Sequence, residues 1–412
     1  MHNEKHCIQH YLNRYAETDL APPNPSLTTL HSALKRVNKR VQWVLVIPVY
    51  DEALPRLQTL FNSLVQAADR AQQSVIVITV FNVPDTASPE TVATNLDVFN
   101  AFVSWSSSLP ETVRVVTLNR IHEPIPKKWG VGLARKIGAD WALALIAEGV
   151  VTTQVILNTD ADVMIPAAYF LHWQHALADH QAVAWTYPFI HIPDTPELSE
   201  ITTEFDQYLN SYVNNLAATG SRHAYFALGS IIGVNAGAYA QVRGFPKKNG
   251  GEDFYLLNKL RKLGSVMRIE GEPLQVLARY SSRVPFGTGP RLQAAMKLID
   301  KQPRFPLPSA EAFHVLSVLL SCIENLPEEI GWGDLQTACD EQANRHPGLA
   351  RALDELGFQP WFEKCRKQRN QTQIKARFLE WFDGFRTLKL LNVVSTKHVA
   401  AMSAANRGGV AT

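Results

Sequence analysis

The stretch "VQWVLVIPVYDE", residues Val41 to Glu52, decides the fold that the sequence predicts. It is a continuous apolar run rich in β-branched side chains, and it ends at the acidic pair Asp51 and Glu52. A strand that is apolar on both faces is typical of a parallel sheet covered by helices on both sides. We therefore expect a buried sheet to begin at about residue 41.

Similar runs alternate with helix-length segments further along the chain. The apolar runs are Ser74 to Asn82, Val113 to Asn119 and Thr153 to Asp160, and the helical segments are Ala53 to Ala71, Pro89 to Ser106 and Val131 to Ala147. Such alternation predicts an α/β fold with right-handed crossovers and a mostly parallel, doubly wound sheet. We expect an N-terminal helix and Pro-rich lead-in over 1–40, the α/β domain over 41–290, and a helical C-terminal region with a flexible tail over 291–412.

Composition excludes several classes of protein. The 412 residues carry 40 Lys and Arg against 38 Asp and Glu, so the chain lacks the positive excess of a nucleic-acid-binding protein. Its four cysteines show no CxxC spacing. The long apolar stretch from Phe313 to Ile323 falls far short of the roughly 20 residues needed to span a bilayer. We expect reduced thiols, a cytoplasmic location and no nucleic-acid partner.

Two aspartates, Asp160 and Asp162, follow the apolar run that ends in "VILNTDAD". Ligands of doubly wound sheets bind beyond the carboxyl ends of the strands, where these side chains would lie. Paired carboxylates suit Mg²⁺ or Mn²⁺, which share such ligands with substrate phosphates. As an isolated pattern this spacing is more often a solvated turn, but the buried strand before it favours a metal site.

A second motif, "WGVGLARKIGAD", places Gly130 and Gly132 at the start of a helix. Glycines there let backbone N–H groups approach an anion, and Arg135 and Lys136 could neutralise phosphate charge. A glycine-tolerant loop with a solvated Arg–Lys pair explains the same residues equally well. The spacing is not GxGxxG, which disfavours a dinucleotide-binding Rossmann fold.

Two further segments each have a structural and a functional interpretation. Glu252 and Asp253 follow two glycines at the start of a helix, where acidic residues ordinarily serve as caps; the functional alternative is a general base for an acceptor hydroxyl. The segment "ARYSSRVPFGTGPRL" interleaves Arg279, Arg283 and Arg291 with glycines and hydroxyls. It is either a loop that grips a diphosphate or an ordinary basic surface loop.

Taken in order, "VIPVYDE", "GVGLAR", "NTDAD", "VRGFP" and "GGED" resemble the family 2 glycosyltransferases of the GT-A fold. The resemblance extends over roughly Val41 to Gly264. It implies a GT-A-type, Rossmann-like sheet and transfer of a sugar from a nucleotide-diphosphate donor, most commonly a UDP-sugar, with inversion. It also implies assistance by a divalent metal, Mn²⁺ or Mg²⁺.

The resemblance also assigns roles to individual residues. It implies Asp253 as the general base with Glu252 beside it, and Asp160 and Asp162 as metal ligands. The implied donor-binding residues are Pro48, Tyr50, Asp51, Glu52, Asn82, Asp85, Gly132, Arg135, Asp160 and Arg283. The turn "FNVPDTAS" departs from the aspartate-rich turn that is usual after the second strand. The identity of the donor's nucleoside base therefore stays open. The QxxRW signature and membrane spans of processive synthases do not occur, which favours transfer of one sugar per encounter.

The C-terminal stretch from Trp361 to His398 carries nine Lys or Arg against three Asp or Glu. Five apolar residues recur there at helical spacing: Phe378, Trp381, Phe382, Phe385 and Leu388. Such a stripe more often packs on its own domain. The alternative is peripheral contact with the inner face of a membrane, where a lipid-linked acceptor would be found. The expected acceptor is a saccharide, a lipid-linked molecule or a small molecule. The resemblance also implies a role in polysaccharide biosynthesis.

Two other functions remain open from the sequence. A sugar-nucleotide-forming nucleotidyltransferase would share the sheet and the carboxylates, but it usually has a Gly-rich basic loop directly after the first strand, which "VIPVYDEALPRL" lacks. A non-catalytic nucleotide-sugar-binding protein would tolerate loss of Asp253. Retention of both Asp162 and Asp253 argues against that alternative.

Overall fold

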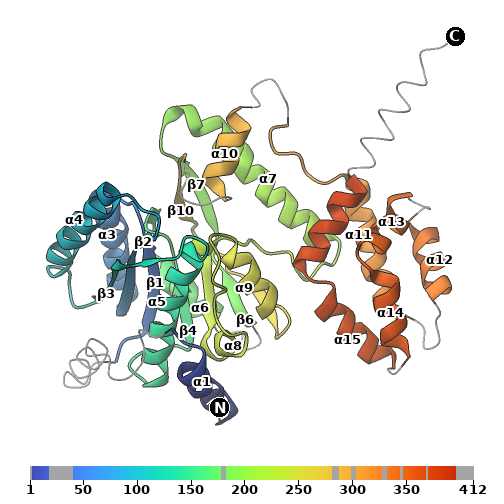
Figure 1. Ribbon diagram of the computed structural model, residues 1–412, viewed down its shortest axis with the longest axis horizontal. Coiled ribbons are helices and arrows are strands. Elements are labelled where there is room, and N and C mark those ends of the chain that lie inside the picture. Colours follow the sequence, from blue (N-terminus) through green and yellow to red (C-terminus); the bar gives the residue numbers. More distant parts are fainter. Residues whose placement is uncertain are drawn as a thin grey trace. The chain divides into compact units, whose positions relative to one another are not determined.

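The computed structural model describes residues 2–17, 40–177, 182–280, 287–297, 303–326, 332–343, 347–367 and 370–395 (Figure 1). The chain forms two compact units. The first comprises Met1–Asp206 and Tyr225–Asp300, and the second comprises Gln207–Ala224 and Lys301–Thr412. The division cuts through helix α7 (Ser199–Ala218), which the sequence did not indicate. The predicted domain boundaries near residues 40 and 290 remain predictions.

A seven-stranded sheet forms the centre of the first unit, in the order β3-β2-β1-β4-β8-β6-β9. Its strands are β1 (Trp43–Val49), β2 (Val75–Pro84), β3 (Val113–Ile125), β4 (Val155–Asn158), β6 (Ala182–Thr186), β8 (Ile232–Asn235) and β9 (Ser265–Arg268). All neighbours pair in parallel except β8, which runs antiparallel to β4 and β6. The predicted α/β fold with a mostly parallel sheet is therefore confirmed.

Three helices connect the first four strands at the predicted places. They are α3 (Leu54–Ala71), α4 (Pro89–Ser106) and α5 (Gly130–Ala147). Right-handed crossovers along this strand order place α3 and α4 on one face and α5 on the other (Figure 1). Helix α5 packs closely on β1, since a Cβ on Gly138 would lie 2.4 Å from Cγ1 of Val46.

A second, three-stranded sheet has the order β5-β10-β7, with β5 (Val163–Met164), β7 (Phe189–Pro193) and β10 (Leu274–Ala278). Strand β5 begins directly after Asp162, and β10 ends directly before Arg279. Their antiparallel pairing continues to Leu277, whose N–H donates to the carbonyl oxygen of Asp162 at 3.1 Å, so Asp162 and Arg279 emerge close together. The remaining elements of this unit are α6 (Tyr169–Ala176), η2 (Pro196–Leu198), the start of α7, η3 (Gly229–Ile231), α8 (Ala236–Gln241), α9 (Glu252–Leu260) and α10 (Thr288–Met296).

The N-terminal helix α1 (His2–Arg14) docks on α5 through a buried carboxylate. Asp140 accepts hydrogen bonds from the hydroxyls of Tyr11 (2.6 Å) and Tyr239 (2.9 Å), and Nζ of Lys136 lies 2.8 Å from its other oxygen. Burial raises the pKa of Asp140, and the charge of Lys136 opposes that shift. Lys136 therefore serves the attachment of α1, and its buried position differs from the solvated Arg–Lys pair that was one of the two interpretations of this motif.

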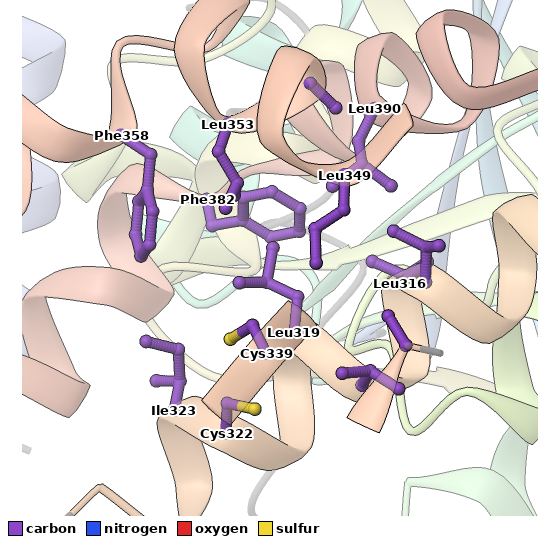
Figure 2. Close-up of a cluster of buried hydrophobic side chains, with 14 of the residues drawn as sticks. Leu316, Leu319, Cys322, Ile323, Cys339, Leu349, Leu353, Phe358, Phe382 and Leu390 are labelled. Atoms are coloured by element: carbon purple, nitrogen blue, oxygen red, sulfur yellow. The ribbon is translucent and has the colours of Figure 1, made fainter. Parts of the chain in front are cut away.

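The second unit is helical, as expected for the C-terminal region. It contains α11 (Ala310–Glu324), α12 (Trp332–Gln342), α13 (Pro347–Glu355), α14 (Phe358–Arg366), α15 (Gln371–Trp381) and helical backbone over residues 384–395. Leucines and phenylalanines from these helices meet around Leu319 in one apolar cluster (Figure 2). The predicted tail beyond residue 395 lies outside the described residues.

The amphipathic stripe of the second unit divides between core and surface. Phe378 and Phe382 are buried in the apolar cluster, and Trp381 packs against it. Phe385 is 53% exposed and Leu388 is 37% exposed. Packing on its own unit therefore accounts for the first half of the stripe, and membrane contact through the second half remains a prediction.

Two simpler expectations concern the described part of the chain. Its helices include none with the length and apolarity needed to cross a bilayer. Cys7, Cys322, Cys339 and Cys365 are all free thiols, as predicted.

Candidate active site

The carboxyl ends of β1 and β4 meet at one edge of the large sheet. Val46 of β1 pairs in register with Asn158 of β4, so the residues that follow both strands emerge side by side. Glu52 follows β1, and Asp160 and Asp162 follow β4. With Glu252 and Asp253 at the start of α9, these side chains form a group that we call the carboxylate cluster. Two arginines, Arg135 and Arg279, join its members.

Arg135 of α5 connects Asp160 to Glu252. Its Nε donates to Oε1 of Glu252 at 2.9 Å, and its Nη2 donates to Oδ1 of Asp160. Nη1 lies 3.5 Å from the carbonyl oxygen of Thr159. Burial lowers the pKa of this guanidinium, but the charges of Asp160 and Glu252 outweigh burial and raise the pKa above its usual value. Arg135 therefore carries a positive charge that holds the end of β4 against the start of α9.

The surroundings of Arg135 show why it lies deep in the protein. The residue is only 2% exposed, and a Cβ on Gly229 would lie 2.3 Å from its Nη2. The absence of a side chain at Gly229 leaves the space that the guanidinium fills. This geometry corrects the interpretation of Arg135 as half of a solvated Arg–Lys pair, and its predicted contact with the donor stays a prediction.

Helix α9 begins at Glu252, directly after Gly250 (φ 111°) and Gly251 (φ 70°). Both glycines adopt positive φ values that other residues rarely reach, and they turn the chain into the helix. Glu252 is buried, and burial raises its pKa while Arg135 opposes that shift. Both acids lie in the first turn of α9, as the sequence predicted.

Asp253 is half-buried at the same turn, and its Oδ1 accepts a hydrogen bond of 2.7 Å from the N–H of Phe254. Burial, followed by the adjacent charge of Glu252, raises the pKa of Asp253 to about 7. A carboxylate with such a pKa can accept a proton near neutral pH, which an ordinary helix cap has no need to do. Functional groups in other proteins are often tuned in this way.

The loop before α9 packs on the start of α5. The N–H of Gly132 donates to the carbonyl oxygen of Lys248 at 3.0 Å, and a Cβ on Gly132 would lie 2.4 Å from the carbonyl oxygen of Pro246. A Cβ on Gly130 would lie 2.2 Å from Oδ1 of Asn249. These contacts explain both glycines without a bound anion. The predicted contact of Gly132 with the donor therefore has no support from this geometry and stays a prediction.

Arg279 links the other members of the carboxylate cluster. Its Nη2 donates to Oε1 of Glu52 and, at 3.1 Å, to Oδ2 of Asp162. Glu52 also lies 3.8 Å from Nη1 of Arg56, whose Nη2 is 3.3 Å from Asp194. The predicted donor residue Glu52 and the predicted metal ligand Asp162 thus share one cation.

The other predicted donor residues lie at the ends of β1 and β2. Asn82 is buried and donates from Nδ2 to the carbonyl oxygen of Val49 at 3.1 Å. Asp85 is exposed, and its Oδ1 accepts a hydrogen bond from the N–H of Lys127 at 2.9 Å.

Pro48 is buried within β1, Tyr50 is half-buried, and Asp51 is exposed with a φ of 54°. Arg283 lies outside the described residues.

The predicted metal ligands have the right chemistry for a divalent ion. Asp160 and Asp162 offer carboxylate oxygens, which Mg²⁺ and Mn²⁺ prefer, and Mg²⁺ commonly binds through one or two carboxylates plus substrate phosphates. No group of three or more His, Cys, Asp or Glu side chains suited to a metal occurs in the described part of the chain. Asp160 and Asp162 as metal ligands stay a prediction, for an ion that would take its other ligands from a bound diphosphate and water.

Sequence reasoning missed two features of this site and one beside it. It did not anticipate that Arg135 and Arg279 would be paired with the acids, because the partners lie 117 residues apart for Arg135 and Glu252 and 227 residues apart for Arg279 and Glu52. It also missed the pair of Lys136 and Asp140, although their i,i+4 spacing on a helix is a recognisable signal.

No family model matches the chain, and no curated protein matches it. A solved structure of S. aureus TarS 1-349 in complex with UDP-GlcNAc has a TM-score of 0.38 and 14% identity, over 88% of this chain and 92% of that one. A mannosyltransferase, PcManGT from Pyrobaculum calidifontis, in complex with GDP-Man and Mn²⁺, has a TM-score of 0.37 and 12% identity, over 96% and 99% of the two chains.

A second TarS structure has a TM-score of 0.36 and 13% identity over 74% of this chain, and the match spans 43% of the TarS chain. All three TM-scores are below 0.5.

Proposed function

We propose that this protein is a GT-A-type glycosyltransferase that moves a sugar from a nucleotide-diphosphate donor to an acceptor hydroxyl with inversion. The donor we propose is a UDP-sugar. The observation that carries the proposal is the bridge made by Arg135. It joins Asp160 of the "NTDAD" motif to Glu252, the neighbour of Asp253, although 92 residues separate Asp160 from Glu252 in the chain.

The proposed base is Asp253. Its pKa of about 7 allows the deprotonated form to exist near neutral pH and still accept a proton from an alcohol during reaction. Asp253 takes the proton of the acceptor hydroxyl while that oxygen attacks the anomeric carbon. The new C–O bond forms as the bond from that carbon to the diphosphate oxygen breaks. Attack from the face opposite the leaving group inverts the anomeric configuration.

The remaining residues of the site have positioning and electrostatic roles. Arg135 fixes Glu252, and therefore the first turn of α9, relative to the end of β4. Asp160 and Asp162 would hold a divalent ion, which when bound supplies positive charge for the departing diphosphate. The resemblance implies that Glu52 and Tyr50, at the end of β1, would contact the nucleoside. Fixed charges of this kind are most effective where charge develops in the transition state.

The experiment that tests the proposal measures nucleoside diphosphate release. Purified protein is incubated with a panel of UDP-, GDP- and other nucleotide sugars, with Mn²⁺ or Mg²⁺, for wild type, Asp162→Ala, Asp253→Asn and the exposed control Asp97→Asn. We expect metal-dependent release from one donor, abolished by Asp162→Ala and reduced about 10²-fold or more by Asp253→Asn.

Other outcomes have defined meanings. If the wild type binds no nucleotide sugar in the presence of metal, the proposal is wrong. Release of pyrophosphate from a nucleoside triphosphate and a sugar phosphate would instead identify a nucleotidyltransferase. Donor binding that Asp253→Asn leaves unchanged, without turnover on any acceptor, would identify a nucleotide-sugar-binding protein.

A further inference from the structure

Arg279 connects two acids that come from different strands. It follows the last residue of β10, and its Nη2 donates both to Oε1 of Glu52 and, at 3.1 Å, to Oδ2 of Asp162. The side chain of Glu52 is 2% exposed, and those of Asp162 and Arg279 are each 15% exposed. One guanidinium nitrogen therefore lies between two carboxylates that are largely shielded from water.

Arg279 uses only part of the hydrogen-bonding capacity of its guanidinium in this arrangement. Arginine binds a carboxylate most strongly through two parallel N–H···O bonds, and here a single nitrogen serves both acids. The Nε of Arg279 is buried and has no hydrogen-bond partner in the part of the chain that the structure describes. A buried N–H without an acceptor is costly, so the guanidinium has an unmet demand for a further anionic or carbonyl oxygen.

Asp162 is also one of the two carboxylates that fit a divalent cation. A metal ion and the Arg279 guanidinium would compete for it, because both are positive and both need the same carboxylate charge. We propose that Arg279 takes the place of the metal ion at Asp162 in the donor-free protein, and that a divalent cation binds Asp162 only when Arg279 moves away. This inference rests on the proposed function.

The donor provides the reason for Arg279 to move. A diphosphate offers several anionic oxygens to a guanidinium, including acceptors for the Nε that has none among the described residues. Once Arg279 is paired with the diphosphate, its positive charge no longer competes with the cation at Asp162. Metal and donor would thus bind with positive coupling, and by linkage each would raise the affinity for the other by the same factor.

The first experiment measures Mn²⁺ affinity without any nucleotide, by electron paramagnetic resonance of free Mn²⁺ during titration of the protein. The variants are Arg279→Met, which removes the charge, Arg279→Gln, which keeps a hydrogen-bond donor, and Arg279→Lys, which keeps the charge. The matched control is Arg56→Met, because Arg56 also contacts Glu52 but pairs with Asp194.

We expect Arg279→Met and Arg279→Gln to bind Mn²⁺ about tenfold or more tightly than wild type, since one opposite charge beside a carboxylate commonly changes its proton affinity by about 1–3 pKa units. Arg279→Lys and Arg56→Met should stay within about twofold of wild type. The gain should disappear when Asp162→Asn is added to Arg279→Met. Circular dichroism verifies that each variant is folded, and Arg279→Gln carries the test if Arg279→Met does not fold.

Unchanged or weaker Mn²⁺ binding by both uncharged variants overturns the inference, as does a gain that persists with Asp162→Asn. The second measurement repeats the titration with UDP and with GDP, where the wild type should gain affinity for Mn²⁺ and Arg279→Met should gain less. Because the first titration contains no nucleotide, its outcome is independent of whether the wild type turns over a nucleotide sugar.

Discussion

At the scale of single residues, the pKa of Asp253 leads to a test of its role. If Asp253 is the general base, kcat/KM must rise with pH through about 7, because only the deprotonated carboxylate can take the proton from the hydroxyl of the sugar acceptor. Asp253→Asn should lose this rising limb together with about 10²-fold or more of the rate. The measurement is a pH profile of nucleoside diphosphate release under kcat/KM conditions, with Asp97→Asn as the control that keeps the limb.

The same raised pKa has a consequence for folding stability. Between the ordinary aspartate pKa of 3.8 and about 7, the folded protein holds a proton at Asp253 that the unfolded chain has released. The stability that this proton confers is complete below pH 3.8 and is lost as the pH rises through about 7. Above pH 7, Asp253→Asn should therefore unfold at higher denaturant concentration than wild type. Lower stability of the variant at pH 8 would contradict the raised pKa.

Arg135 shows how one buried charge organises several acids. Its neighbours Asp160 and Glu252 are each held by one of its nitrogens, and the guanidinium is almost fully shielded from water. Buried ion pairs are weak evidence for stability, since desolvation offsets their attraction. Their value here is geometric, because the pairing fixes the distance between the "NTDAD" turn and the first turn of α9.

At the scale of elements, the contact between α5 and the loop before α9 sets the position of Asp253. A methyl group at Gly132 would approach the backbone oxygens of Pro246 and Lys248 to 2.4 and 2.6 Å. Because neither neighbour is the end of a flexible side chain, the loop must move. We expect Gly132→Ala to cost about 1–3 kcal/mol of unfolding free energy and to lower kcat about tenfold or more.

Urea unfolding and turnover of Gly132→Ala measure the two effects. The control is Gly333→Ala in α12, where an added Cβ meets no atom within 4 Å and a higher helix propensity should stabilise slightly. A Gly132→Ala protein with wild-type stability but weakened donor binding would instead favour the predicted role of Gly132 as a donor contact.

At the scale of the whole molecule, the described residues of the carboxylate cluster all belong to one compact unit. The other unit has its own apolar core, in which Leu319 is fully buried among residues of several helices (Figure 2). We expect Leu319→Ala to cost about 2–5 kcal/mol of unfolding free energy in that unit, because it leaves a cavity. Nucleotide affinity should remain within about twofold of wild type.

Calorimetry and nucleotide titration check this expectation. A conservative companion variant, Leu319→Met, should cost less than about 1.5 kcal/mol. If Leu319→Ala is folded at the assay temperature and yet loses nucleotide binding, the site depends on the helical unit more than the residues named above indicate.

The sequence by itself determined the first four strands of the large sheet, the three helices between them and the acidic residues that follow β1 and β4. Strands β1 to β4 and helices α3, α4 and α5 follow from runs of apolar residues and from their spacing, which are local properties. Parallel strands place their carboxyl ends at one edge, so Glu52, Asp160 and Asp162 could be assigned to the same site before any contact was known.

Only the tertiary structure decided which charges neutralise one another. Arg135 and Lys136 are neighbours in the chain and looked equivalent, yet Arg135 holds Asp160 and Glu252, and Lys136 holds Asp140 beneath α1. The pairing of Arg279 with Glu52 and Asp162, and the raised pKa of Asp253, likewise depend on distances and burial. Electrostatic energies change steeply with separation and with exposure to water, and the order of residues along a chain specifies neither quantity.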